Sequence, residues 1–192
     1  MKRILFVCTG NTCRSPMAEA MLRELAARNG VSLEVRSAGV STVNGLPVSP
    51  HAAETLRRKG IAHTGQSQSL TGDAIGWADL ILTMTSGHKR GLLQWFPQAV
   101  EKTHTLMEYV NQDETVIEHI HELEQLYSEM HVKQALGQQL SAAERSRLLA
   151  LEREIPSFDI ADPYGGPLDL YRSCANEIER ALLKLLDKLR QE

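Results

Sequence analysis

Cysteine and aromatic residues are scarce in this chain of 192 residues, and it has no excess of basic charge. Three cysteines are too few for the disulfide framework of a small secreted domain. A net charge of −3 gives no overall positive field to attract nucleic acid or an anionic membrane. We therefore expect neither partner, and an anionic ligand would have to be bound by a local site.

Long apolar runs are also missing near the N-terminus. Only five apolar residues, Ile4 to Cys8, follow Lys2 and Arg3, which is too few for a secretory signal or a membrane-spanning helix. We therefore expect a cytoplasmic protein whose cysteines are reduced at rest. The cysteines lack the paired Cys or His spacing of a zinc site, so we predict no metal.

The chain is organised around the segment from Cys8 to Pro16, CTGNTCRSP, which follows the β-rich apolar run 4–7. The residues after Pro16 have helical spacing, so the pattern predicts a strand-to-helix turn. Such a turn presents backbone N–H groups and the positive end of a helix dipole to an anion. We expect Gly10 to supply the conformational freedom that a tight turn needs.

A cysteine and an arginine with five residues between them frame this loop. The loop N–H groups can hold phosphate oxygens while the planar guanidinium of Arg14 binds two of them. The same positive groups favour the thiolate form of Cys8, which is the form that attacks. The spacing therefore predicts a nucleophile beneath a phosphate, surrounded by Thr9, Gly10, Asn11, Thr12, Cys13, Arg14 and Ser15.

Strand-like apolar segments alternate with helical segments over the first hundred residues. The expected strands are 3–8, about 33–39, 79–84 and 103–106, and the expected helices are 16–29, 51–59, a short one before Trp77, one between Thr85 and Pro97, and 168–189. This alternation predicts an α/β fold with a right-handed parallel sheet covered on both faces. Ligands of such sheets bind at the carboxyl ends of the strands, which is where Cys8 falls.

The pattern changes after Asp113, where two helical segments follow each other without a strand. Ser141 and Glu144 form a capping box that opens the second of them. We read residues 112–155 as a helical hairpin inserted into a single domain that spans residues 1–192. Two roles stay open for it, a packing or dimerising appendage and a substrate-docking arm, and the oligomeric state is not predicted.

A group that leaves phosphorus needs a proton, so a carboxylic acid is expected near the loop. Asp159 and Asp162 are both candidates. Asp162 is favoured because Pro163 restrains its backbone and glycines follow Tyr164, which suits a loop that approaches a ligand. An Asp before a Pro is also a common turn element, so the residues alone leave both carboxylates open.

CTGNTCRSP near the N-terminus and DPYGG from Asp162 together resemble the low-molecular-weight protein tyrosine phosphatase superfamily, in particular its bacterial protein-arginine phosphatase branch. The likeness spans the chain except residues 112–155. It implies a flavodoxin-like three-layer sandwich with a four-stranded parallel sheet, and a phosphocysteine mechanism without a cofactor. Carried over, it implies Cys8 as the nucleophile, Arg14 as the phosphate clamp, and Asp162 as the acid and later the base.

The resemblance also implies supporting roles. Asn11, Ser15 and Ser37 are similar to the polar residues that hold the loop and favour the thiolate. Cys13 is similar to the neighbouring cysteine that traps the oxidised nucleophile. We therefore predict a reversible disulfide between Cys8 and Cys13 under peroxide.

Thr12 distinguishes two substrate classes within this resemblance. Tyrosine phosphatases of the family usually have Ile or Leu there and a second aromatic residue after the Asp-Pro pair, whereas this chain has Thr12 and, after Tyr164, Gly165. A threonine hydroxyl can hydrogen-bond a guanidinium, while a phenol ring loses apolar contact. Asp162 can also pair with the guanidinium. The prediction is hydrolysis of phosphoarginine on phosphorylated proteins, with Thr12 and Tyr164 setting the specificity.

Three other functions are weighed against this one. Phosphotyrosine hydrolysis is the main alternative. An arsenate reductase would need further redox cysteines on a mobile segment, and only Cys174, in the middle of a predicted helix, is left. A phosphate-binding module without catalysis has no need for Cys8, Arg14 and Asp162 together.

Overall fold

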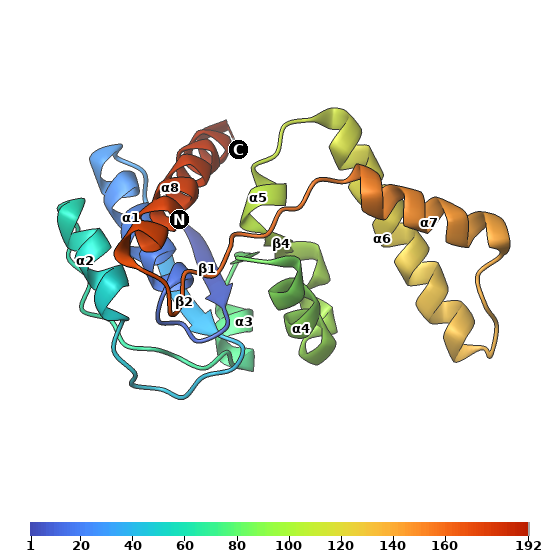
Figure 1. Cartoon of the computed structure of the whole chain (residues 1–192), viewed down its shortest axis with the longest axis horizontal. Coiled ribbons are helices and arrows are strands. Elements are labelled where there is room, and N and C mark those ends of the chain that lie inside the picture. The colour runs from blue at the N-terminus through green and yellow to red at the C-terminus, as the bar shows by residue number, and fades with distance from the viewer. Residues whose placement is uncertain (192) are drawn as a thin grey trace. The chain divides into compact units, whose positions relative to one another are not determined.

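The computed structural model describes residues 1–191 of the chain. Figure 1 shows the strands and helices coloured along the chain. The elements, in chain order, are β1 (Lys2–Cys8), α1 (Arg14–Arg28), β2 (Leu33–Gly39), α2 (Pro50–Arg58), α3 (Gly72–Trp77), β3 (Leu80–Thr83), α4 (Ser86–Trp95), the 3₁₀ helix η1 (Pro97–Lys102), β4 (Thr103–Thr105), α5 (Leu106–Tyr109), α6 (Glu114–Ala135), α7 (Ala142–Glu154) and α8 (Leu168–Gln191).

The four strands form one parallel sheet in the order β2-β1-β3-β4. Strand β1 is central, with residues 2–8 paired to residues 33–39 of β2 and residues 4–7 paired to residues 80–83 of β3. Strand β4 extends the sheet through the pairing of Ile81 with Thr103. The predicted α/β class and the four-stranded parallel sheet are confirmed.

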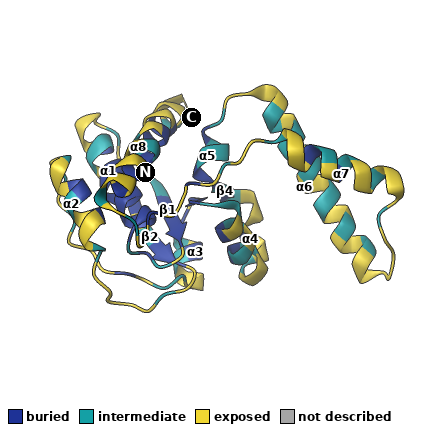
Figure 2. Ribbon diagram, viewed as in Figure 1, coloured by how far each residue is buried: buried dark blue, intermediate teal, exposed yellow. Residues whose placement is uncertain are grey.

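Helices cover both faces of the sheet, which gives the predicted three layers. Side chains of Ile4 and Phe6 pack with apolar residues of α1, α2 and α8, while Leu5 and Val7 pack with α3, α4 and η1. All four are 0 or 1% exposed. A run that is buried on both faces is typical of a parallel strand, and Figure 2 shows this buried centre. It fixes the carboxyl end of β1, and therefore Cys8, between the layers.

Most helix and strand boundaries lie within two residues of the prediction, and two of the departures have a clear local cause. Helix α1 begins at Arg14 rather than residue 16, because Pro16 falls in the first turn, where its missing N–H costs nothing. Strand β4 ends at Thr105 rather than residue 106, because Thr105 and Glu108 form a capping box for α5. The side chain of Thr85 caps α4.

Residues 111–157 form a compact unit of their own, separate from the unit of residues 1–110 and 158–192. It holds the predicted hairpin, in which the Ser141 capping box opens α7. Ion pairs join α6 and α7, with Lys133 Nζ 2.7 Å from Glu144 Oε2. No residue of α6 is fully buried, so its apolar face is only partly covered. That the chain works as one domain with an insertion stays a prediction.

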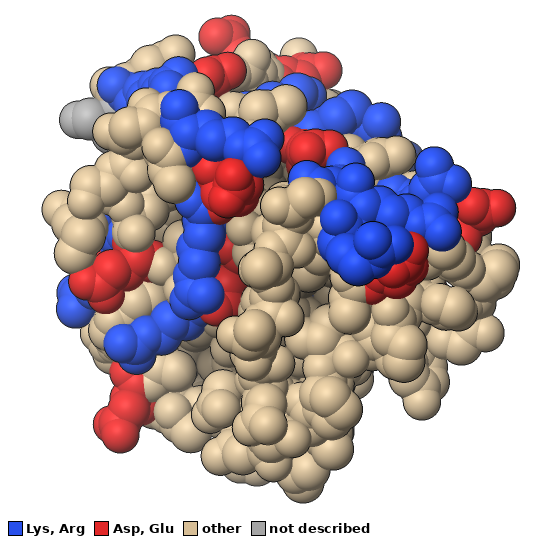
Figure 3. Space-filling view, turned by 90° about the vertical axis from the view of Figure 1, so that its left-hand side faces the viewer, with Lys and Arg blue, Asp and Glu red and all other residues tan. Residues whose placement is uncertain are grey.

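Charges of both signs are interleaved on the surface. Figure 3 shows one face on which Lys and Arg side chains border Asp and Glu, with a broad uncharged area below them. Pairs such as Lys59 Nζ with Glu179 Oε2, 2.6 Å apart, neutralise part of the charge locally. Among residues 1–191, no helix is both long enough and apolar enough to cross a lipid bilayer.

Candidate active site

The loop between β1 and α1 lies at the carboxyl end of the central strand. Cys8 is the last residue of β1, and α1 begins at Arg14 with no side chain capping it. Within the described part of the chain, the backbone N–H groups of Gly10, Asn11 and Thr12 donate to no main-chain carbonyl. Unpaired N–H groups at the start of a helix are suited to binding an anion.

The sulfur of Cys8 contacts a hydroxyl on this loop. Cys8 is 3% exposed, and its Sγ lies 2.9 Å from Ser15 Oγ. The same Oγ accepts a hydrogen bond from Asn11 Nδ2 at 2.8 Å, which leaves the hydroxyl hydrogen of Ser15 free to be donated to sulfur. A donor aimed at sulfur stabilises a thiolate. The loop therefore holds Cys8 in an arrangement suited to nucleophilic attack.

Asn11 holds the loop in shape. Its Nδ2 donates to both Ser15 Oγ and Ser37 Oγ at 2.8 Å, and its Oδ1 accepts from the backbone N of Gln68 at 2.8 Å. Its φ of 55° is in the left-handed region, which Asn tolerates better than most residues. The prediction that Gly10 supplies the turn's conformational freedom is wrong, because the positive φ falls on Asn11.

Two residues that the sequence analysis missed support this network. The carboxylate of Glu19 accepts a short hydrogen bond from Ser37 Oγ and pairs with Arg23 Nη2 at 2.7 Å. The available signal in the sequence was an acidic residue, Glu19, among the apolar residues of the helix that follows the loop. The Cβ of an added side chain at Gly39 would lie 2.6 Å from the carbonyl oxygen of Thr9, so this glycine allows the close approach of β2 to the loop.

Arg14 joins the loop to the segment that precedes α8. Arg14 is 4% exposed; its Nη1 donates to the carbonyl oxygen of Ile160 at 2.8 Å, and its Nη2 lies 3.3 Å from Asp162 Oδ2. The structure thus places the segment around Asp162 next to the loop that contains Cys8 and Arg14, although the two segments are far apart in the sequence.

The two candidate carboxylates differ in their contacts. Asp159 Oδ1 accepts from the backbone N of Ser86 at 2.7 Å, at the start of α4. Asp162 Oδ1 accepts from the backbone N of Tyr164 at 3.2 Å, and its side chain is 51% exposed beside Arg14. The contact with Arg14 places Asp162 beside the loop, and this favours it over Asp159 as the acid.

The predicted specificity and redox positions lie around the same loop. Thr12 is partly exposed, and its carbonyl oxygen accepts from the backbone N of Ser49 at 2.9 Å. Tyr164 is 76% exposed.

Cys13 Sγ lies 3.4 Å from Ser49 Oγ and 3.5 Å from Tyr171 Oη. Burial, followed by the contact with Cys13, raises the pKa of Tyr171 to about 12.

The structure shows all three cysteines as free thiols, so it shows no pairing of Cys8 with Cys13. Burial raises the pKa of Cys174 to about 12. A thiol that resists ionisation is a packing residue rather than a nucleophile. This agrees with the reading of Cys174 as part of a core helix.

His88 is a further residue of the site that the sequence analysis left without a role. It is 8% exposed, and its Nε2 lies 2.8 Å from Thr9 Oγ1. Burial, and then the positive charge of Arg14, lower the pKa of His88 to about 4, against a smaller opposite effect of Asp162 and Asp159. Its partner on the loop is 79 residues away along the chain, so no local pattern pointed to it.

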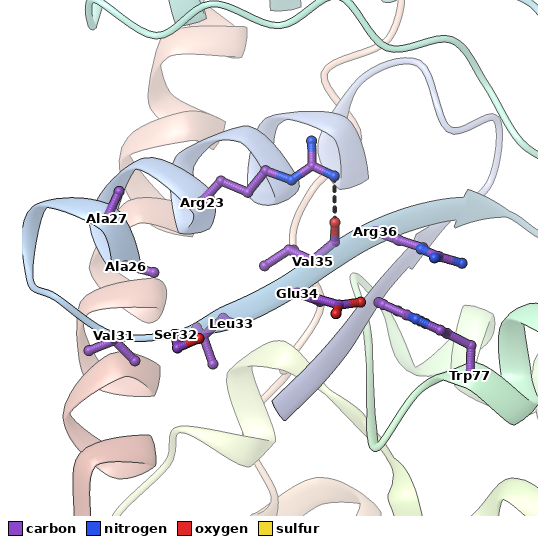
Figure 4. Close-up of a pocket in the computed structure, with 10 residues that line it drawn as sticks. All are labelled: Arg23, Ala26, Ala27, Val31, Ser32, Leu33, Glu34, Val35, Arg36 and Trp77. Atoms are coloured by element: carbon purple, nitrogen blue, oxygen red, sulfur yellow. Dashed lines mark hydrogen bonds between the residues drawn. The ribbon is translucent and has the colours of Figure 1, made fainter. Parts of the chain in front are cut away.

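Two further cavities lie along β2. One, of about 430 Å³, runs along β2 between α1 and Trp77 and contains none of the predicted site residues (Figure 4). There Arg23 Nη2 donates to the carbonyl oxygen of Val35 at 2.6 Å, and Arg36 lies 4.1 Å above the Trp77 ring. The other, of about 330 Å³, borders Asn11.

In residues 1–191, no three His, Cys, Asp or Glu side chains form a group that could hold a metal ion.

The fold and the Cys8 loop define a family of phosphatases. The family model described as low molecular weight phosphotyrosine protein phosphatase matches residues 3–128. The chain belongs to this family, as the resemblance of its two motifs predicted.

Two curated relatives are similar over nearly the whole chain. A protein-arginine-phosphatase of Geobacillus stearothermophilus is 36% identical over 99% of this chain and 97% of its own length. A protein-arginine-phosphatase of Bacillus subtilis is 33% identical over 98% of this chain and 97% of its own. A solved structure of the arginine phosphatase YwlE, a cysteine-to-serine variant with a phosphorylated active-site serine, matches with a TM-score of 0.74, 33% identity, and 99% and 97% coverage of the two chains.

Proposed function

We propose that this chain hydrolyses phosphoarginine on proteins through a cysteinyl-phosphate intermediate. The observation that carries the proposal is the likeness, along both full lengths, to proteins named protein-arginine-phosphatase, in a chain that has Thr12 in the loop. The geometry supports the chemistry, because the loop after Cys8 has unpaired N–H groups, the hydroxyl of its Ser15 contacts Cys8 Sγ, and the buried Arg14 follows in the same segment.

In the proposed first step, the Cys8 thiolate attacks phosphorus and the P–N bond breaks. The carboxyl group of Asp162 gives its proton to the departing nitrogen and becomes a carboxylate, and the arginine side chain leaves as its ordinary positively charged guanidinium. The loop N–H groups and Arg14 stabilise the negative charge of the transferring phosphoryl group. The products are the free arginine side chain and phosphocysteine.

In the second step, water attacks the phosphocysteine. The carboxylate of Asp162 takes a proton from the water, the S–P bond breaks, and inorganic phosphate leaves with Cys8 again a thiolate. Asp162 is thereby protonated for the next cycle. Its exposed side chain leaves it open to both the substrate and water.

Two side chains, Thr12 in the loop and Asp162 beside it, support phosphoarginine rather than phosphotyrosine as the substrate. A threonine at position 12 offers a hydroxyl to the guanidinium N–H groups and less apolar surface to a phenol ring. The carboxyl group of Asp162, protonated for the first step, still has an oxygen that can accept a hydrogen bond from a guanidinium N–H group. Phosphotyrosine hydrolysis is the second candidate, because the matching family model carries that activity in its description.

A side-by-side assay tests the proposal. A protein phosphorylated on arginine and a phosphotyrosine peptide are given to the wild type and to Cys8→Ser. We expect faster release of phosphate from phosphoarginine by the wild type and none by Cys8→Ser. Faster turnover of phosphotyrosine would favour the second candidate, and equal activity of Cys8→Ser would refute the cysteine mechanism. The protein substrates and the cytoplasmic location remain predictions.

A further inference from the structure

The side chain of His88, in α4, contacts the loop between Cys8 and Arg14, which we call the phosphate loop. It lies in the first turn of that helix, where its backbone N donates to Thr85 Oγ1 at 3.1 Å, and its Nε2 lies 2.8 Å from Thr9 Oγ1. Thr9 is the residue after the proposed nucleophile. Its carbonyl oxygen also accepts from the backbone N of Ser41 at 3.0 Å, so main chain and side chain are both held.

The ring of His88 is neutral at neutral pH. Burial is the main cause of its lowered pKa, and the charge of Arg14 adds to it, while Asp162 and Asp159 oppose it. A neutral imidazole has one N–H and one bare nitrogen. Only one of the two nitrogens can therefore donate.

The contacts decide which nitrogen donates. Within residues 1–191, the buried Nδ1 has no hydrogen-bond partner. A buried donor without an acceptor is the costlier arrangement, so Nδ1 is the bare nitrogen and Nε2–H donates to Thr9 Oγ1. The hydroxyl hydrogen of Thr9 then points away from the ring, and the rotation of this side chain is fixed.

We propose that His88 is a positioning residue of the phosphate loop, which holds the Thr9 hydroxyl through Nε2–H and so orders the loop next to Cys8 for phosphate. This inference rests on the proposed function only in requiring that phosphate binds in the loop. It does not depend on whether the substrate is phosphoarginine or phosphotyrosine.

The test compares two amides that differ in reach. The nitrogen of a Gln side chain can take the place of Nε2, whereas the shorter Asn places its amide near the position of Nδ1 and cannot reach Thr9. With para-nitrophenyl phosphate, we expect His88→Asn to lower kcat/KM about tenfold, as for the loss of one hydrogen bond. We expect His88→Gln to recover most of this loss. Inorganic phosphate should inhibit His88→Asn more weakly than the wild type, measured at a temperature at which circular dichroism shows both proteins folded.

A double-mutant cycle separates positioning from a structural role. Thr9→Val removes the hydroxyl, and we expect adding His88→Asn to it to cost little more, because both changes break one bond. Additive losses, an Asn variant as active as the wild type, or a Gln variant as impaired as Asn would each overturn the inference. If His88→Asn does not fold, Thr9→Val still decides, since full activity without the hydroxyl would refute it. A wild type that is inactive on both para-nitrophenyl phosphate and a protein phosphorylated on arginine would instead refute the proposed function.

Discussion

Arg14 Nη2 lies 3.3 Å from Asp162 Oδ2, and this pair joins the loop of Cys8 to the segment before α8. The side chain of Arg14 is buried while that of Asp162 is half exposed. One positive group can therefore face both the phosphate and the proposed acid.

Asp162→Asn removes the proposed acid and keeps the side-chain shape. We expect kcat to fall by about 10²- to 10⁴-fold, because no proton is delivered to the leaving nitrogen. Asp159→Asn is the matched control, since its Oδ1 can still accept from Ser86 and its activity should stay near that of the wild type. Steady-state kinetics on phosphoarginine protein measures both, and a larger loss in Asp159→Asn would reverse the assignment.

Thr12→Ile replaces the hydroxyl at the loop mouth with a branched alkyl chain. We expect the ratio of phosphoarginine to phosphotyrosine turnover to fall by at least about tenfold, since a hydrogen bond is lost and apolar contact is gained. The ratio is taken from kcat/KM on both substrates with the same enzyme preparation. An unchanged ratio would rule out Thr12 as the selector.

Cys13→Ser tests the predicted redox protection. After peroxide and then thiol, we expect the wild type to regain activity and the variant to regain much less, because Cys8 then oxidises beyond recovery. Mass spectrometry of the peroxide-treated wild type should detect the Cys8–Cys13 disulfide before reduction. Equal recovery in the two proteins would exclude protection by Cys13.

Gly39→Ala and Gly10→Ala form a matched pair. A Cβ at position 39 would lie 2.6 Å from the Thr9 carbonyl oxygen, whereas a Cβ at position 10 would have its nearest contact at 3.5 Å, with Thr12 Oγ1. We expect Gly39→Ala to lower the free energy of unfolding by about 2 kcal/mol and Gly10→Ala by less than about 1 kcal/mol. Urea denaturation measures both, and the reverse order would contradict the packing described for β2.

The lowered pKa of His88 predicts a pH dependence of stability. The folded value is about 4 against an ordinary value of 6.5, so between these pH values the unfolded chain binds more protons. Stability contributed by neutral His88 is therefore present above pH 6.5 and is lost as pH falls towards 4, by up to about 3 kcal/mol. Denaturation of the wild type and His88→Gln from pH 7 to 4 measures this difference, and parallel curves would contradict it.

Much of the site could be predicted from sequence because its central signals are local. The apolar run of β1, the glycine and polar residues of the loop and the helical spacing after Pro16 occur within a short segment, and their order dictates a strand, a turn and a helix. The prediction of Asp162 as the acid depended on the family resemblance, because Asp159 has the same chemistry and lies close by in the sequence. Only the fold shows that Asp159 accepts a hydrogen bond from Ser86.

The remaining features depend on contacts between distant segments. The bond of His88 to Thr9 and that of Asn11 to Gln68 join residues 79 and 57 positions apart, and no spacing rule links them. The error at Gly10 has a similar cause. The side chain of Asn11 gains three partners by adopting a left-handed backbone, and this benefit is visible only once Ser37 and Gln68 are in place.

The carbonyl of Ile160 that receives the Arg14 guanidinium comes 146 residues later in the chain. During synthesis the loop of Cys8 therefore emerges from the ribosome long before the residues that orient its arginine. A nascent chain that ended within the α6–α7 hairpin would lack both that carbonyl and the carboxylate beside it. Catalytic turnover should therefore begin only when translation is nearly finished, and a nascent chain that lacks these two groups should be inactive.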